Sequence, residues 1–277
     1  MENTAFSSRT DIAHFARPTP FEMTLPYGDY KFSRRLYEVV HDWGIPTELE
    51  VAFLQKFLPP SGARVLDLAC GAGRHSVSLA AYRHNLTGID IGGFTINLAR
   101  NLARESGVIV NFRTGDIKEI TFESGFDLVF FISGQMAHLS LDENELIFDR
   151  INRALKPGAV FIIHLECFAP EDRQNLTFWY REIKPLYFAN PSLVHREQYY
   201  FPREQVKLIR DFAIDSVTKE SGLFGYSEKE YTMEEVARLA AGTGFAITDK
   251  FGGYEGAPVR QDSHDRIFVL RKTGQSF

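Results

Sequence analysis

The sequence is poor in cysteine and in long apolar runs, and each shortage excludes a class of protein. Its two cysteines, Cys70 and Cys167, are too few for a disulfide framework, and neither stands in a metal-ligand spacing. No run approaches the roughly 20 apolar residues that span a bilayer, and no N-terminal stretch resembles a signal peptide. We therefore expect reduced thiols and a cytoplasmic protein with no membrane partner.

An excess of positive charge is also absent. The formal net charge is −5, from 31 Lys and Arg against 36 Asp and Glu, and the basic residues are dispersed along the chain. Binding to a nucleic-acid backbone needs clustered positive charge, so we expect no nucleic-acid partner. What the sequence does contain is 44% apolar residues, which is enough for a substantial core.

From residue 64 onward, short apolar runs alternate with helical stretches. The runs predicted as strands are 64–69, 86–90, 108–113, 126–132 and 159–166, and the predicted helices between them are 73–82, 93–106 and 142–155. The Ser140-x-x-Glu143 spacing is a capping box that starts the last of these helices, and Lys156-Pro157-Gly158 ends it. Strands that are apolar on both faces and separated by helices predict an α/β protein, a doubly wound parallel sheet.

The pattern changes in the second half of the chain. Polar and aromatic residues alternate over 171–231, which predicts a small antiparallel β insertion rather than a second globular domain. A helix from Thr232 and strands near 245–251 and 266–271 then resume the α/β pattern. The predicted division is an N-terminal arm with helices over 1–60, an α/β domain over 61–170 and 232–277, and the insertion over 171–231.

Aromatic residues concentrate in this insertion. They supply shaped apolar area with polar tips, so we interpret the insertion as a lid over a substrate pocket. Two other interpretations stay open, a packed accessory sheet and a surface through which the protein forms a homo-oligomer. The aromatic residues in question are Phe178, Trp179, Tyr180, Tyr199, Tyr200 and Phe201.

The stretch VLDLACGAGRHS, residues 65–76, joins the first strand to the first helix. A glycine-rich turn at that point presents backbone N–H groups, which predicts a ligand at the carboxyl edge of the sheet. The pattern Gly71-x-Gly73-x-x-Ser76 lacks the third glycine of the dinucleotide fingerprint, so we expect looser packing at position 76. The phosphate-binding pattern GxxxxGK[ST] is also missing. A ligand other than a dinucleotide or a nucleoside triphosphate is favoured.

Acidic residues end or follow the next two strands. Asp90 ends the second strand, where its carboxylate can accept both hydroxyls of a ribose. Asp116 follows the third strand in the tripeptide GDI, where it can accept from an adenine amino group beside the apolar Ile117. Together with the glycine loop, the two acids predict an adenosine-containing cofactor.

The series VLDLACGAGRH, TGID, GDI, FDLVFF and LKPG resembles class I S-adenosylmethionine-dependent methyltransferases over nearly the whole chain after residue 36. Its later part resembles a small-molecule subgroup that includes glycine and aminosugar N-methyltransferases. The resemblance implies a Rossmann-like seven-stranded sheet whose last strand is antiparallel, with S-adenosylmethionine as cofactor. The cofactor-binding residues that it implies are Tyr37, Asp67, Ala69, Gly71, Gly73, Arg74, Asp90, Ile91, Asp116, Ile117 and Ile132.

Plainer interpretations stand beside some of these residues. Asp67 can serve only to orient the amides of the loop. Arg74 and His75 can be surface residues of the helix, with Arg74 the better candidate for reaching the cofactor carboxylate. Cys70 is most simply a small buried residue beside the loop.

The segment ISGQMAHLSLDENE after the fourth strand is where the methyl acceptor should approach. Its MAHL resembles the corresponding segment of the N-methyltransferase subgroup, so His138 is predicted to position the acceptor or to act as acid or base. His164 and Glu166 lie two residues apart near the end of the fifth strand, and Glu166 is placed to bind an ammonium group. The alternative is that these side chains only satisfy local hydrogen bonds.

These observations predict a methyltransferase for a small molecule, with an amine nitrogen favoured as acceptor. The NPPY and DPPY signatures of base-modifying enzymes and a Pro-Cys nucleophile are absent, which agrees with a small acceptor. The first alternative is an O-methyltransferase of a metabolite or natural product. Others are an NAD(P)-binding oxidoreductase and an S-adenosylmethionine-binding module without activity.

Overall fold

A computed structural model describes residues 18–40, 47–260 and 263–273 of the chain. Parts of the predicted N-terminal arm, 1–17 and 41–46, lie outside the described residues. The chain divides into two compact units, and the larger one consists of Pro26–Ala169 and Lys229–Phe277. The smaller one consists of the chain up to Leu25 and Pro170–Glu228. Helices α2 and α3, which the sequence analysis assigned to the arm, thus belong to the larger unit.

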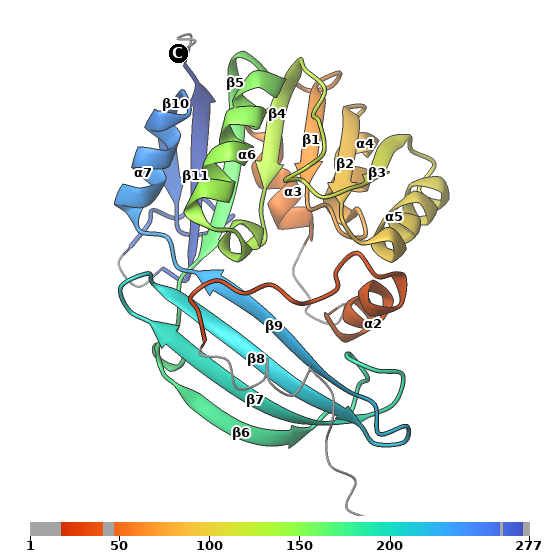
Figure 1. Ribbon diagram of the computed structural model, residues 1–277. Coiled ribbons are helices and arrows are strands. Elements are labelled where there is room, and N and C mark those ends of the chain that lie inside the picture. Colours follow the sequence, from red (N-terminus) through yellow and green to blue (C-terminus); the bar gives the residue numbers. More distant parts are fainter. Residues whose placement is uncertain (1–17, 41–46, 261–262, 274–277) are drawn as a thin grey trace, which may run out of the picture. The chain divides into compact units, whose positions relative to one another are not determined.

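A seven-stranded sheet forms the centre of the larger unit (Figure 1). The strand order is β10-β11-β5-β4-β1-β2-β3, and only β11 runs antiparallel to its neighbours. This arrangement confirms the predicted doubly wound α/β fold with an antiparallel last strand. The strands are β1 (Arg64–Leu68), β2 (Asn85–Asp90), β3 (Val110–Thr114), β4 (Phe126–Phe131), β5 (Leu155–Glu166), β10 (Phe245–Phe251) and β11 (Asp265–Lys272).

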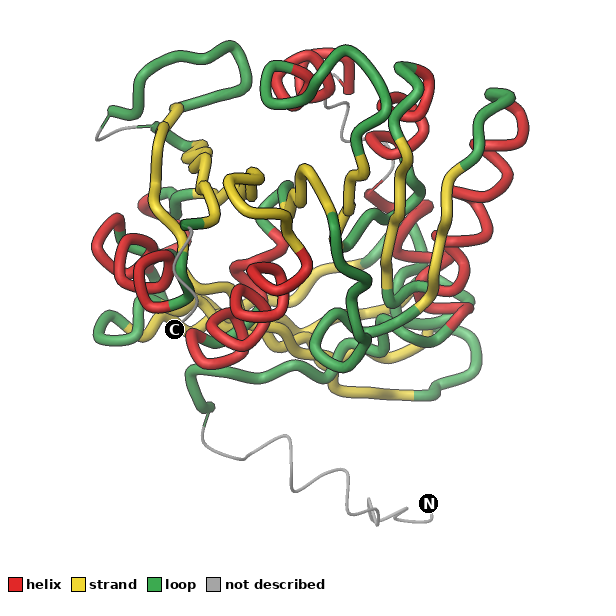
Figure 2. Tube along the Cα trace, turned by 90° about the horizontal axis from the view of Figure 1, so that it is seen from above, coloured by secondary structure: helices red, strands yellow, loops and turns green. Residues whose placement is uncertain are grey.

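Helices cover both faces of this sheet, as Figure 2 shows. Helices α6 and α7 bury Ile147, Ile151 and Leu239 in the apolar cluster of one face. On the other face, α3 and α4 bury Phe53, Leu54 and Leu79. The helices of this unit are α2 (Tyr30–Val40), α3 (Thr47–Gln55), α4 (Arg74–Ala81), α5 (Gly93–Glu105), α6 (Leu141–Ala154) and α7 (Met233–Gly242), with a 3₁₀ helix η1 (Gln135–His138).

Two helices begin as their sequence predicts. Ser140 caps α6 and Thr232 caps α7. In each case the side chain of the Glu three residues later accepts the backbone N–H of the cap residue, which completes a capping box. The residues predicted to end α6 belong instead to the following strand. Lys156-Pro157-Gly158 lies inside β5, where the pairing with β4 shifts register, because Gly158 has a φ of 73° and the chain bulges there.

The smaller unit contains a four-stranded sheet in the order β6-β7-β8-β9. Its β6–β7 and β7–β8 pairs are antiparallel, as predicted for the insertion. The sheet is compact in its own right, with Val194, Leu208 and Ala213 fully buried. Met23 bridges to Tyr226 of β9, which joins the N-terminal stretch to this sheet. The remaining elements are η2 (Pro170–Arg173), β6 (Leu176–Arg181), β7 (Ser192–Phe201), β8 (Val206–Asp215) and β9 (Ser221–Lys229).

Strand β6 leaves two aromatic side chains in solvent. Phe178 is 45% exposed and Trp179 is 55% exposed, so neither side chain is buried in the core of the smaller unit. The role of this sheet as a lid or as a homo-oligomer surface stays a prediction. Within the described ranges, no helix combines the length and the apolarity that crossing a bilayer requires.

The capping box of α7 yields a prediction about stability. Thr232→Ala removes the side-chain acceptor of the Glu235 N–H, and we expect the free energy of unfolding to fall by about 1 kcal/mol. Thr232→Ser keeps the hydroxyl and should retain most of the stability. Urea unfolding of the three proteins measures the difference, and equal midpoints for Thr232→Ala and the wild type would contradict the assignment.

Candidate active site

The residues predicted to bind the cofactor gather at one edge of the larger sheet. Strands β3, β2, β1, β4 and β5 are neighbours and parallel, so their carboxyl ends lie side by side. Asp67 lies near the end of β1, Asp90 ends β2 and Glu166 ends β5. In doubly wound sheets this edge is where ligands bind.

The glycine loop after β1 is built from left-handed backbone conformations. Ala69, Gly71 and Gly73 have φ values of 55°, 53° and 78°. A Cβ on Gly73 would lie 2.6 Å from the ring of Phe112, so glycine is required there on steric as well as conformational grounds. A Cβ on Gly71 would meet no atom within 4 Å. The loop therefore packs tightly on its inner side and faces open space at Gly71.

The Asp90 carboxylate joins two loops. Its Oδ2 accepts the Gly71 N–H at 2.9 Å, and its Oδ1 accepts the Gly92 N–H at 2.8 Å and the Thr95 hydroxyl at 3.1 Å. Burial raises the pKa of Asp90 and outweighs these bonds, which favour the charged form. A carboxylate has about four acceptor positions, so at least one is left for a ligand.

Asp67 is a buried acid with an altered ionisation. It is 2% exposed, and its Oδ2 accepts the Ser76 hydroxyl at 2.7 Å. Burial raises the pKa of Asp67 to about 7, although the Ser76 bond acts in the opposite direction. Ser76, where looser packing was expected, is instead fully buried, because its hydroxyl occupies the space beside Asp67.

A polar network fixes the start of α4. Arg74 donates through Nη1 to Glu50 and, at 3.0 Å, to Thr47 of α3. His75 Nε2 lies 2.8 Å from the same Glu50 oxygen. Burial acts to raise the pKa of Glu50, but the bonds from His75 and Arg74 outweigh it and lower the pKa below its ordinary value. Glu50 is thus an ionised carboxylate that is only 2% exposed.

This network corrects one interpretation of the sequence. His75 is not a surface residue, since it is 5% exposed and its ring meets Phe130 edge to face. Arg74 is 33% exposed and uses only Nη1 in the hydrogen bonds of the described residues. Its remaining N–H groups are therefore available to a carboxylate.

The side of the site near β2 and β3 contains the remaining predicted contacts. Asp116 Oδ1 accepts the Lys118 N–H at 2.8 Å in a turn after β3, and Ile117 packs against the α6 face of the core. Ile91 is 40% exposed just after Asp90. Tyr37 of α2 meets Phe94 at a ring distance of 6.2 Å, so α2 lies against the start of α5 beside the Asp90 loop.

The residues predicted to face the acceptor lie in the segment after β4 and at the end of β5. Ile132 is buried, whereas His138, the last residue of η1, is half-buried. Glu166 is exposed, and its Oε1 would lie 3.2 Å from a Cβ placed on Gly134, near the start of the same segment. A carboxylate therefore lies against the turn that leads to His138.

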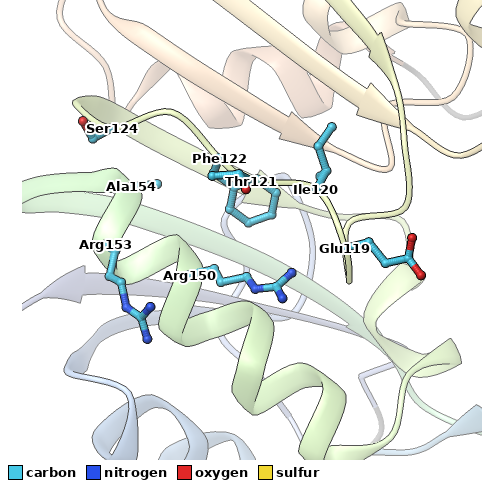
Figure 3. Close-up of a pocket in the computed structure, with 8 residues that line it drawn as sticks. All are labelled: Glu119, Ile120, Thr121, Phe122, Ser124, Arg150, Arg153 and Ala154. Atoms are coloured by element: carbon cyan, nitrogen blue, oxygen red, sulfur yellow. The ribbon is translucent and has the colours of Figure 1, made fainter.

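A surface pocket lies outside this edge. Figure 3 shows it between the β3–β4 connection and the C-terminal half of α6, with Ile120, Phe122 and Arg150 among its lining residues. None of the predicted site residues lines it. It therefore adds nothing to the cofactor or acceptor assignments.

Sequence reasoning missed two buried polar residues near the site, Glu50 and Asn144. A signal for both exists. Glu50 lies three, four and seven residues before the apolar Phe53, Leu54 and Phe57, which places it on the buried face of the helix. Asn144 lies at the same helical spacing from the buried apolar residues of α6. A polar side chain on the apolar face of a helix needs a buried partner, and it can be recognised from periodicity alone.

The fold and the edge that collects these residues define a class I methyltransferase. Comparison with protein families matches residues 59–238 to the family described as "Methyltransferase domain". The chain belongs to this family and is an S-adenosylmethionine-dependent enzyme. This assignment replaces the oxidoreductase alternative.

Individual relatives include both nitrogen and oxygen methyltransferases. The chain is 26% identical over 241 residues to a cypemycin N-terminal methyltransferase of Streptomyces sp. This match covers 85% of this chain and 94% of that protein. It is 37% identical over 86 residues to a ubiquinone biosynthesis O-methyltransferase of Xanthomonas axonopodis pv. citri, over 30% of this chain and 35% of that protein.

Among solved structures, an S-adenosylmethionine-dependent methyltransferase from Clostridium acetobutylicum has the same fold. The TM-score is 0.68 at 18% identity, over 88% of this chain and 99% of that chain. At this identity the likeness concerns the fold alone.

The raised pKa of Asp67 predicts how stability depends on pH. The folded protein keeps its proton up to about pH 7, whereas the unfolded chain releases it near the ordinary value of 3.8. The unfolded state therefore binds fewer protons in this interval, and the contribution of Asp67 to stability falls as pH rises from about 4 to about 7. The Asp67→Asn variant has no group that titrates at this position, and its amide oxygen can still accept the hydrogen bond from the Ser76 hydroxyl.

Urea unfolding at pH 5 and pH 8 measures the effect. The free energy of unfolding of Asp67→Asn minus that of the wild type should be larger at pH 8 than at pH 5. An identical pH dependence of the two proteins would mean that Asp67 ionises normally in the fold.

Proposed function

We propose that this enzyme transfers the methyl group of S-adenosylmethionine to an amine nitrogen of a small molecule. The observation that carries the proposal is the exposed Glu166 carboxylate beside the turn that leads to His138. An amine reaches the site mostly as an ammonium ion, which a carboxylate attracts. The likeness to a cypemycin N-terminal methyltransferase over most of both chains supports nitrogen over oxygen.

The glycine loop and its neighbours fit the cofactor. The space outside Gly71 leaves room for it, and the free acceptor position of Asp90 suits a ribose hydroxyl. Asp116, with Ile117 and Ile91, would hold the adenine. The unused N–H groups of Arg74 would bind the α-carboxylate, with Thr47 and Glu50 keeping the guanidinium in place. Asp67 and the backbone of Ala69 and Gly73 would line the methionine end, and Tyr37 and Ile132 would exclude water.

The bound cofactor supplies an electrophilic methyl group on a sulfonium. The chain's own residues must hold the acceptor in line with that methyl group and leave its lone pair free. Glu166 would bind the ammonium form, and His138 would take the proton that the amine loses before attack. A hydroxyl acceptor, the second candidate because of the O-methyltransferase relative, would need the same proton removal but carries no positive charge for Glu166 to attract.

The experiment that tests this function is a panel of matched acceptors with radiolabelled S-adenosylmethionine. Each amine is paired with the alcohol or phenol that replaces its nitrogen by oxygen. We expect label in the amines and little in their oxygen counterparts. Label only in the oxygen compounds would refute the nitrogen assignment while leaving the methyltransferase activity intact.

The role of His138 gives a second test. His138→Ala should lower turnover of the best amine by about 10²–10⁴-fold, the usual contribution of a positioned acid or base, with unchanged affinity for S-adenosylhomocysteine. His138→Asn separates the two roles, because an amide can position an acceptor but cannot carry a proton near neutral pH.

Turnover by steady-state kinetics and affinity by calorimetry provide the comparison. If His138 acts as a base, the Asn variant is nearly as slow as the Ala variant, and if it positions the acceptor, Asn restores much of the rate. Full activity of both variants would remove His138 from the site and make Glu166 the next residue to change.

A further inference from the structure

The segment after β4, residues 133–140, has a backbone conformation that must be held in place. Ser133 and Gly134 have φ values of 60° and 69°, two left-handed residues in succession. A non-glycine residue in this region costs free energy and persists where its surroundings enforce it. The 133–140 loop then continues through η1 to Ser140, the cap of α6.

The first support of the loop is a buried histidine. His164 of β5 is 6% exposed, and its Nδ1 accepts the Ser133 N–H at 3.2 Å. Because Nδ1 accepts, Nε2 carries the proton, and it donates to Asp265 Oδ1 at 3.2 Å. The bond from His164 lowers the pKa of Asp265 to about 2, so this partner stays ionised. The pair fixes both the tautomer and the orientation of the imidazole ring.

The second support is at the other end of the loop. The amide nitrogen of Asn144, which is fully buried, lies 3.1 Å from the Met136 carbonyl and 3.3 Å from the Leu139 carbonyl. Tyr231 donates its hydroxyl to the Leu139 carbonyl at 2.9 Å and accepts from Asn144 at 2.6 Å. These contacts join the loop to α6 and to the residue before the cap of α7.

This second support has a cost that packing alone does not explain. The Oδ1 atom of Asn144 is buried and has no hydrogen-bond partner among the residues that the structure describes. An unsatisfied buried acceptor destabilises the fold, and an apolar side chain of the same shape would avoid the penalty. What the amide provides that an apolar residue cannot is directed donation to loop carbonyls.

We propose that His164, with Asp265, and Asn144, with Tyr231, are positioning residues for methyl transfer. They hold the 133–140 loop from both ends and so fix His138 relative to the end of β5. The loop is then a preorganised part of the site rather than a segment that forms when the acceptor binds. The inference rests on the proposed function, because it assigns the acceptor-facing role to His138.

The test compares variants at both ends with a matched control. His164→Phe keeps a ring but leaves the Ser133 N–H without an acceptor, whereas His164→Asn offers an amide oxygen in the place of Nδ1. Asn144→Leu removes the donors at the other end. Thr243→Val is the control, because it removes a buried hydroxyl whose hydrogen bonds, among the described residues, go to Leu239 and Ala240 of α7 and not to the 133–140 loop.

Hydrogen exchange of peptide 133–140 reports the loop without any acceptor. We expect faster exchange in His164→Phe and Asn144→Leu, near wild-type protection in His164→Asn, and no change in Thr243→Val. With the best amine of the panel, kcat should fall by about 10–100-fold in the first two variants, because small displacements of positioned groups lower rates this much. Affinity for S-adenosylhomocysteine should stay at the wild-type value.

Two results would overturn the inference. One is unchanged loop exchange in both His164→Phe and Asn144→Leu. The other is an equal loss of kcat in Thr243→Val when its melting temperature falls by the same amount, since general destabilisation would then explain the effect. The exchange result does not depend on the acceptor class, and the kcat result can be measured with whichever acceptor of the panel is methylated. An enzyme that labels no amine while exchange responds as expected would refute only the proposed function.

Discussion

The Asp90 carboxylate is the contact on which the loops at the proposed cofactor edge depend. It accepts from Gly71 in the loop after β1 and from Gly92 in the loop after β2, so one side chain sets the relative position of both. The Gly115 N–H then bonds to the carbonyl of Asp90, which adds the end of β3 to the same group. Three neighbouring strand ends are thereby fixed before any ligand enters, and binding does not have to order them.

Buried charge is distributed differently on the two sides of the site. Near the glycine loop, Glu50 is kept ionised by His75 and Arg74, while burial raises the pKa of Asp67 to about 7 despite the charge of Arg74. Near β5, Asp265 is kept ionised by His164. Paired carboxylates of this kind orient their partners rather than react, whereas Glu166 at the end of β5 is exposed, as its proposed role toward an acceptor requires.

Much of the candidate site could be predicted from the sequence because its signals are local. The glycine loop, Asp90 and Asp116 each lie at the end of an apolar run, and parallel strands bring such ends to one edge of a sheet. The errors were also local. A surface position for His75 was one interpretation, because nothing near it in the chain reveals Glu50, which lies 25 residues away. Looser packing at Ser76 was expected from the missing third glycine, and the bond of Ser76 to Asp67 could not be foreseen because Asp67 is on a strand rather than on the same helix.

The sequence by itself determined the order of helices and strands in the α/β part, the capping boxes of two helices and the sheet edge at which the predicted site residues lie, since periodicity and capping involve residues a few positions apart. Only the tertiary structure decided which buried polar groups meet. Asn144 and Tyr231 are 87 residues apart, and Ser133 and His164 are 31 apart. Contacts of this kind depend on how helices and strands pack, and no local pattern records them. For that reason the class of reaction followed from the sequence, while the supports of the 133–140 loop emerged only from the fold.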